Sequence, residues 1–208
     1  MYLTGTARVT ALRKDIREDL RRAAEGPGRG GDFHVPFWTA AKAHARNLGD
    51  LPTMVDDLVA RNPRRARLYP LLEDGFLTYW NERRRWINEP FEVLHDSVRA
   101  RYAVESLSCS VKVENLFSVR MADGAFRLIY PYFSEDPILR DEAARLGLWV
   151  MGRAIRNFDP RGFRILDVLR ATSFRAEEHP FRGDEENLFL DKYADLLREW
   201  QRLRREYD

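Results

Sequence analysis

Basic and aromatic side chains that suit nucleic-acid binding gather between residues 64 and 86 of the chain. Guanidinium groups contact phosphates, and aromatic rings stack on unpaired bases. The candidate nucleic-acid-binding residues are Arg64, Arg65, Arg67, Arg83, Arg84, Arg85 and Trp86. In a second interpretation the arginine run is a solvated helix end that complements the C-terminal end of the helix dipole, and Trp80 and Trp86 belong to the core.

Side chains that commonly hold metals or act as nucleophiles are few and scattered. His34, His44, His95 and His179 have no partner histidine at i+3 or i+4, so we interpret them as surface or capping residues rather than as zinc ligands. The single cysteine, Cys109, excludes an internal disulfide and a multi-thiolate metal site. Its alternating apolar neighbours favour a small core residue over a nucleophile. Nucleophile elbows, Walker A loops and EF-hand loops are absent as sequence patterns.

One phosphate-binding pattern occurs by spacing alone. Gly26, Gly28 and Gly31 satisfy G-x-G-x-x-G. A dinucleotide fingerprint follows a buried strand and opens a helix, whereas this one follows a charged helix and contains Pro27. We therefore interpret the segment as a linker.

Length and composition predict one globular domain. The chain has 208 residues, of which 44% are hydrophobic and 33% charged, with a formal net charge of +2. A chain of this size can bury a substantial core without disulfides or metals. No apolar run approaches the roughly 20 residues that a membrane span needs, and the N-terminal residues lack the apolar region of a secretory signal, so we expect a cytoplasmic protein. All but four of the 35 basic residues are arginine, which we attribute mainly to genome composition.

The first hundred residues predict helices. Apolar residues recur at helical spacing over residues 7–25, 34–47 and from about 50 to 61, where Asp50 and Pro52 provide a cap signal. A stronger helix starts near Pro63 or Pro70 and ends before Pro90. We treat residues 1–100 as a helical subregion of a single domain that spans residues 1–208.

After residue 100 the apolar period changes to two. Residues 104–113, 117–121 and 126–133 predict an antiparallel three-stranded meander, with a hairpin turn at Asp123-Gly124. A long helix over 138–158, strands at 163–169 and 173–177, and a C-terminal helix from Asp184 complete the subregion 101–208. The predicted fold is α+β: a helical N-terminal half packed on a mixed sheet.

This order of elements, with Val113-Glu114-Asn115 before one strand and Tyr130-Pro131-Tyr132 at the end of the next, resembles the RecB-type branch of the restriction-endonuclease-like PD-(D/E)XK superfamily over about residues 104–177. The resemblance implies a core in which carboxylates bind a divalent metal that activates water, while a lysine steadies the hydroxide. Glu114 matches the first acid, but the second acid falls on Tyr130 and the lysine on Tyr132. The resemblance thus implies an inactive copy, or metal ligands that have moved to Glu105, Asp123 or Glu135.

Three functions follow as hypotheses. The first is a non-catalytic accessory protein on a degenerate nuclease-like core that binds nucleic acid, with no cofactor. The second is a protein-interaction scaffold. The C-terminal helix through Trp200 and Tyr207 packs on its own domain in the preferred interpretation and offers a docking face for a partner protein in the other. The third is a nuclease with relocated ligands that uses Mg²⁺ or Mn²⁺, with Glu114 and Asp123 as its catalytic residues. None of the three hypotheses places the protein in a membrane.

Overall fold

The computed structural model describes residues 5–25, 33–86 and 90–207. Contacts between Cα atoms divide the chain into two units: Phe33–Phe181, and Met1–Asp32 together with Arg182–Asp208. The prediction of a single domain, 1–208, with subregions 1–100 and 101–208 stays a prediction.

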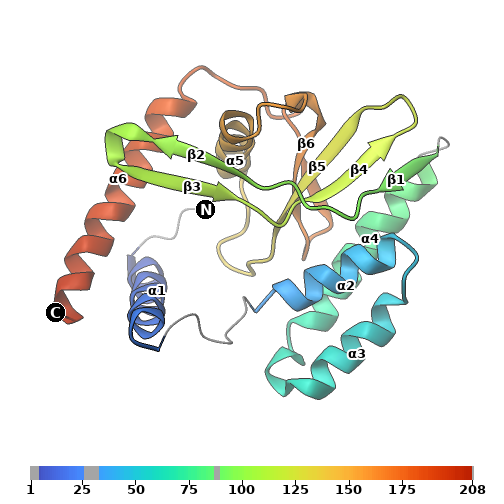
Figure 1. Ribbon diagram of the computed structural model, residues 1–208, viewed down its shortest axis with the longest axis horizontal. Coiled ribbons are helices and arrows are strands. Elements are labelled where there is room, and N and C mark those ends of the chain that lie inside the picture. The colour runs from blue at the N-terminus through green and yellow to red at the C-terminus, as the bar shows by residue number, and fades with distance from the viewer. Residues whose placement is uncertain (1–4, 26–32, 87–89, 208) are drawn as a thin grey trace. The chain divides into compact units, whose positions relative to one another are not determined.

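A five-stranded mixed sheet lies at the centre of the larger unit (Figure 1). In sheet order its strands are β1 (Phe91–Val93), β4 (Phe117–Met121), β5 (Phe126–Tyr132), β6 (Phe163–Asp167) and β7 (Thr172–Phe174). All neighbours are antiparallel except β5 and β6, which are parallel and are connected through α5 (Asp141–Ala154). The hairpin predicted at Asp123-Gly124 joins β4 to β5, and Gly124 has the positive φ of 81° that such a turn favours.

Helices cover both faces of this sheet. On one face α2 (Val35–Ala45), α3 (Leu51–Arg61) and α4 (Tyr69–Trp86) share a core with alternate residues of the strands; a short helical turn, η1 (Pro63–Arg65), precedes α4. On the other face α5 packs against the intervening residues, among them Leu128, Phe163 and Ile165. Because side chains alternate along each strand, one sheet supplies two cores. The α+β class, with helices leading, is confirmed.

The predicted meander has a different first strand. Residues 104–113 do not form one strand: β2 (Ala100–Val104) and β3 (Cys109–Val113) are separated by η2 (Glu105–Leu107) and pair with each other in a two-stranded sheet. The reason is local, since Ser108 adopts a left-handed conformation with a φ of 48° and ends the turn. The third strand of the antiparallel run is β1, which is too short to show a period of two.

The long helix also begins later than the sequence signals indicate. The helix predicted from residue 138 starts at Asp141, after Arg140. Asp141 and Glu142 occupy its first turn, where negative charge suits the helix dipole. The prediction placed the start three residues too early and the end four residues too late, at residue 158 instead of Ala154.

The smaller unit pairs the two ends of the described chain. Helix α1 (Gly5–Glu25) packs against α6 (Glu185–Arg204), which is followed by η4 (Arg205–Tyr207). Their shared apolar cluster is built on the buried side chains of Leu12, Ile16 and Leu203. The apolar stripe of the C-terminal helix therefore has an intramolecular partner.

Substituting Asp50, the N-cap of α3, tests a cap signal read from the sequence. Its carboxylate accepts hydrogen bonds from the Thr53 N–H at 3.3 Å and the Thr53 hydroxyl at 3.0 Å. Asp50→Ala should lower the free energy of unfolding by about 1 kcal/mol, because the first-turn N–H loses its acceptor. Urea unfolding measures this, with the exposed mid-helix Asp57→Ala as the control expected within about 0.5 kcal/mol of the parent. Equal losses in both variants would contradict the cap assignment.

Candidate nucleic-acid interface

Two of the arginines proposed for nucleic-acid binding have partners within the chain. Both amino groups of the Arg67 guanidinium donate to the Glu135 carboxylate. Arg65 donates to the Leu58 carbonyl at 3.2 Å and its guanidinium carbon lies 5.3 Å from the centre of the Tyr69 ring. Arg64 is exposed in η1. Because phosphate contacts at Arg65 or Arg67 would compete with these bonds, the two residues are better assigned to joining α3, α4 and the segment after β5.

The second part of the predicted basic region lies outside the described side chains. Arg83, Arg84, Arg85 and Trp86 end α4, and the structure describes their backbone but not their side chains. Trp80, one turn earlier, is buried, and its ring packs on aromatic neighbours in the core. The glycines at 26, 28 and 31 also lie outside the described residues.

The acids proposed for a nuclease do not come together. Glu114 precedes β4 and Asp123 follows it, so the two lie beyond opposite ends of that strand, and an Asp123 oxygen accepts from the Ala125 N–H at 2.9 Å. Glu105 lies in η2, and Glu135 is bound by Arg67. Among the residues that the structure describes, no three His, Cys, Asp or Glu side chains form a group that could hold a metal ion.

The two tyrosines at the end of β5 differ in environment. Tyr130 is 37% exposed, whereas Tyr132 packs into the core beneath α5 and its hydroxyl donates to the Pro137 carbonyl. Burial is the main cause that raises the pKa of the Tyr132 phenol. Tyr132 therefore acts as a neutral hydrogen-bond donor that fixes the segment after β5.

His34, His44 and Cys109 have structural surroundings, whereas the side chain of His95 is 87% exposed at the surface. The Nδ1 atom of His44 accepts from the Leu51 N–H at 3.1 Å, and the ring of His34 stacks on Phe133 at 4.8 Å. Burial raises the pKa of the Cys109 thiol, which disfavours the thiolate that a nucleophile requires.

Five basic residues from α2 and the β2–β3 hairpin form a surface that the sequence did not indicate. We call it the α2–hairpin basic surface, and it consists of Lys42, Arg46, Arg99, Arg101 and Lys112. Lys42 lies in the last turn of α2 and Arg46, four residues later, is its C-cap, so the two lie on one side of the helix end. Arg101 and Lys112 are directly opposite each other in the hairpin, on its exposed face, and Arg99 lies two residues before Arg101.

The charges on this surface repel one another. Burial lowers the pKa of the Lys42 amine, and the positive charges of Arg46 and Arg99 act in the same direction. Like charges that face each other across two strands are destabilising. Within the described ranges, none of the five forms an ion pair, although many arginines elsewhere do, such as Arg120 with Glu92 and Arg202 with Glu199. The surface thus concentrates positive charge in a chain whose net charge is only +2.

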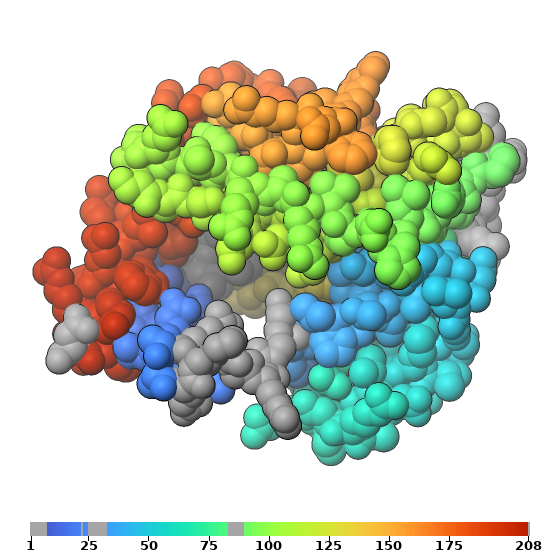
Figure 2. Space-filling view, in the orientation of Figure 1, coloured from blue at the N-terminus to red at the C-terminus, as the bar shows by residue number. Residues whose placement is uncertain are grey.

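An indole hydrogen bond holds the two halves of the surface together. The Trp38 indole N–H, one turn before Lys42, donates to the Asn115 carbonyl at 2.7 Å, just after β3. Asn115 has a φ of 63°, the left-handed conformation that asparagine tolerates. In Figure 2 the blue surface of α2 borders the green surface of the chain around β2 and β3. Two segments far apart in sequence thereby lie next to each other.

No protein-family model, curated protein or solved structure matches this chain. In the part of the chain that the structure describes, no helix has both the length and the apolar character needed to cross a membrane.

Proposed function

We propose that this chain is a non-catalytic accessory protein that binds the phosphate backbone of nucleic acid through the α2–hairpin basic surface. The observation that carries the proposal is the absence of acidic partners for these five residues within the described ranges, together with the direct opposition of Arg101 and Lys112. Phosphates of a bound strand would neutralise this repulsion and release counterions. Lysine and arginine contacts to phosphate carry no sequence information, so we expect binding with little sequence preference.

The missing catalytic pair supports a non-catalytic reading. The resemblance to the restriction-endonuclease-like core rests on residues 104–177, of which β4, β5, α5 and β6 keep the expected order, whereas the expected first strand, 104–113, belongs to the separate β2–β3 sheet. By that resemblance, Tyr130 and Tyr132 stand at the positions of the second carboxylate and the lysine. Glu114 alone would be a weak magnesium site, because such sites use additional carboxylate or substrate oxygens.

Salt dependence of binding tests the proposal. The affinity for a short mixed-sequence oligonucleotide, measured by fluorescence anisotropy between about 50 and 200 mM salt, should fall steeply. Arg101→Gln/Lys112→Gln should weaken binding and reduce the slope of log K against log salt by about 2, roughly 1 for each phosphate contact. The control is Arg120→Gln/Arg202→Gln, which removes the same charge from residues already paired with acids and should leave the slope unchanged.

Three outcomes would contradict the proposal. Identical slopes in the two double variants would remove the surface from the interaction. A salt-insensitive oligomer without oligonucleotide binding would favour the scaffold hypothesis. Manganese-dependent cleavage of the oligonucleotide that is lost in Glu114→Ala would instead favour a nuclease with relocated ligands.

A further inference from the structure

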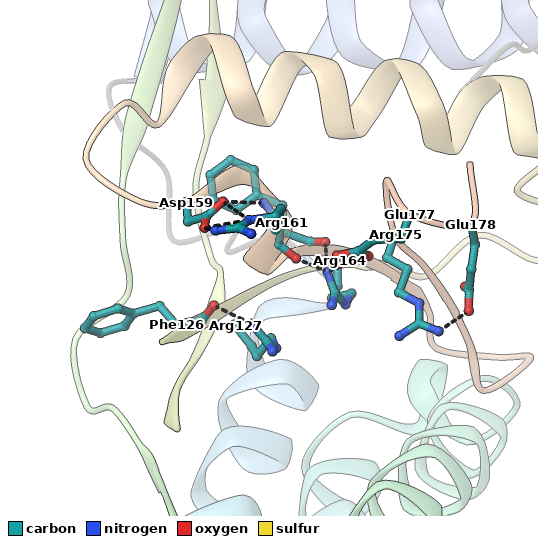
Figure 3. A network of polar contacts seen from close by, with 9 residues as sticks. Phe126, Arg127, Asp159, Arg161, Arg164, Arg175, Glu177 and Glu178 are labelled. Carbon is teal, nitrogen blue, oxygen red and sulfur yellow. Dashed lines mark hydrogen bonds and ion pairs between the residues drawn. The ribbon is translucent and has the colours of Figure 1, made fainter. Parts of the chain in front are cut away.

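A second group of arginines lies on one face of the main sheet, at the end where β6 begins. We call Arg127, Arg164 and Arg175 the arginine row; they come from β5, β6 and the residue after β7. Strands β6 and β7 are antiparallel and pair Ile165 with Phe174, so Arg175 comes opposite Arg164. Strand β5 pairs Ile129 with Arg164, so these two side chains are on the same face of the sheet. Arg127 lies two residues before Ile129 and is therefore on that face too. Figure 3 shows the three side chains extending to the same side of the strands.

The two strands that carry Arg127 and Arg164 approach closely at Gly162. A Cβ atom on Gly162 would lie 2.1 Å from the Phe126 carbonyl oxygen. No other residue fits this position without moving the backbone. The contact therefore fixes the start of β6 against the start of β5, and with it the spacing of the two arginines.

Arg164 is an incompletely neutralised buried cation. Its residue is 7% exposed, and one guanidinium nitrogen donates to the carbonyls of Arg161 at 2.6 Å and Phe163 at 2.7 Å. The carboxylate paired with it belongs to Glu177, at 3.9 Å, and that side chain is half exposed. Burial lowers the pKa of the Arg164 guanidinium, and Arg127 and Arg175 act in the same direction. Such burial costs free energy unless an anion compensates for it.

The neighbouring acids are largely committed to other arginines. Asp159 binds Arg161 through both oxygens, and Glu178 binds Arg175. The ion pairs join Asp159 to Arg161, Glu177 to Arg164 and Glu178 to Arg175, so within the described residues the positive charge of Arg127 has no ion-pair partner. Arg127 makes only a long hydrogen bond, 3.4 Å, to the Phe126 carbonyl among the described residues.

Two polar atoms beside the row are buried without a hydrogen-bond partner in the described part of the chain. They are the Arg175 Nε and the Ser173 Oγ, two residues apart along the edge strand and therefore on one face. Buried donors are rarely left unsatisfied in folded proteins. Two unsatisfied polar atoms on the face that carries the arginine row suit a ligand rich in acceptor oxygens.

We propose that the arginine row, with Ser173, binds a tetrahedral oxyanion of the phosphate class, either free phosphate or a phosphate monoester. Guanidinium groups match the oxygens of such an anion with paired, charge-assisted hydrogen bonds. Arg127 and Arg175 are half-buried and Glu177 is exposed, so the row reaches the surface at this end of the sheet. The site shares no residue with the α2–hairpin basic surface and does not depend on the function proposed for it.

Calorimetric titration of the full chain tests the site, with inorganic phosphate added against sodium chloride of equal ionic strength. We expect saturable binding that Arg127→Gln/Arg175→Gln weakens roughly 10-fold or more, the loss expected for charge-assisted hydrogen bonds. Arg101→Gln/Lys112→Gln should leave it unchanged, which separates this site from the nucleic-acid surface. Phenyl phosphate is the second ligand: tighter binding than inorganic phosphate assigns a monoester, and weaker or equal binding assigns the free ion.

Circular dichroism first verifies that the double variant is folded, and Ser173→Ala serves as a milder variant, for which we expect a smaller but measurable loss of affinity. The proposal is overturned if phosphate gives no more heat than chloride. It is equally overturned if the folded arginine variants bind phosphate as tightly as the parent chain.

Discussion

Gly75→Ala should lower the free energy of unfolding by about 3 kcal/mol, at the upper end of what overpacking usually costs. Gly75 lies inside α4, and a Cβ atom there would sit 2.0 Å from the carbonyl oxygen of Val168 and 3.0 Å from its carbonyl carbon. Both partners are backbone, so neither can rotate away. The helix would have to move off the end of β6, which opens the core around Phe76 and Leu166.

Gly152→Ala is the matched control. It too replaces a helical glycine, in α5, but a Cβ atom there meets nothing within 4 Å. Alanine has the higher helix propensity, so this variant should gain up to about 1 kcal/mol. Guanidinium unfolding of the two variants and the parent chain measures the difference. Similar changes in both variants would mean that α4 does not approach β6 as closely as described.

Arg170→Ala should be the second strongly destabilising change, at about 3 kcal/mol near neutral pH. Asp167 ends β6 with 1% of its surface exposed, and Arg170 lies 3.1 Å from its carboxylate. Arg170 also donates to the carbonyls of Ser134 and Glu135, tying the segment after β5 to the sheet. Removing one partner of a buried pair leaves an uncompensated charge, which is the costly way to break it.

The loss in Arg170→Ala should grow as pH rises. Burial raises the pKa of Asp167 in the folded protein, and Arg170 partly opposes that shift. Without Arg170 the folded-state pKa rises further above the unfolded value of about 3.9. Between these two pKa values Asp167 is protonated in the folded variant and ionised in the unfolded chain. The free energy of unfolding is therefore greatest below the unfolded pKa and falls as pH rises through the raised folded pKa.

Urea unfolding at several pH values between about 4 and 7 measures this dependence. Adding Asp167→Asn to Arg170→Ala removes the buried charge and should abolish the extra pH dependence while restoring part of the stability. A loss that is the same at every pH, or unchanged by Asp167→Asn, would show that the carboxylate is not its source.

Sequence patterns predicted the helices and most strands because those signals are local. Asp50 caps α3 and Asp184 precedes α6, as their residue types indicate, and Asp123-Gly124 makes the hairpin turn. Strand β1 was missed because three residues after Pro90 are too few to display alternation. The predicted pairing of residues 104–113 with the strand at 117–121 was also wrong, because β3 pairs with β2. Pairing depends on tertiary packing rather than on the strand's own residues.

The basic surface could not be predicted, because its residues come from segments about 55 to 70 positions apart. Lys42 and Lys112 are two of only four lysines, yet each appears in the sequence as a single charge on an amphipathic element. Conversely, Arg65 and Arg67 stand in a basic run, but their partners Tyr69 and Glu135 become apparent only in the folded chain. Clustering of charge in sequence and clustering in space are separate properties here.

The packing of α1 against α6 has a consequence for biosynthesis. A ribosome completes α1 well before it reaches α6, so Leu12 and Ile16 stay uncovered throughout translation of the segment between them. Closing so long a loop is entropically unfavourable until the sheet-bearing unit has already become compact. We therefore expect the exposed apolar side chains of α1 to bind chaperones during synthesis. We also expect the pairing of α1 with α6 to be the last step of folding.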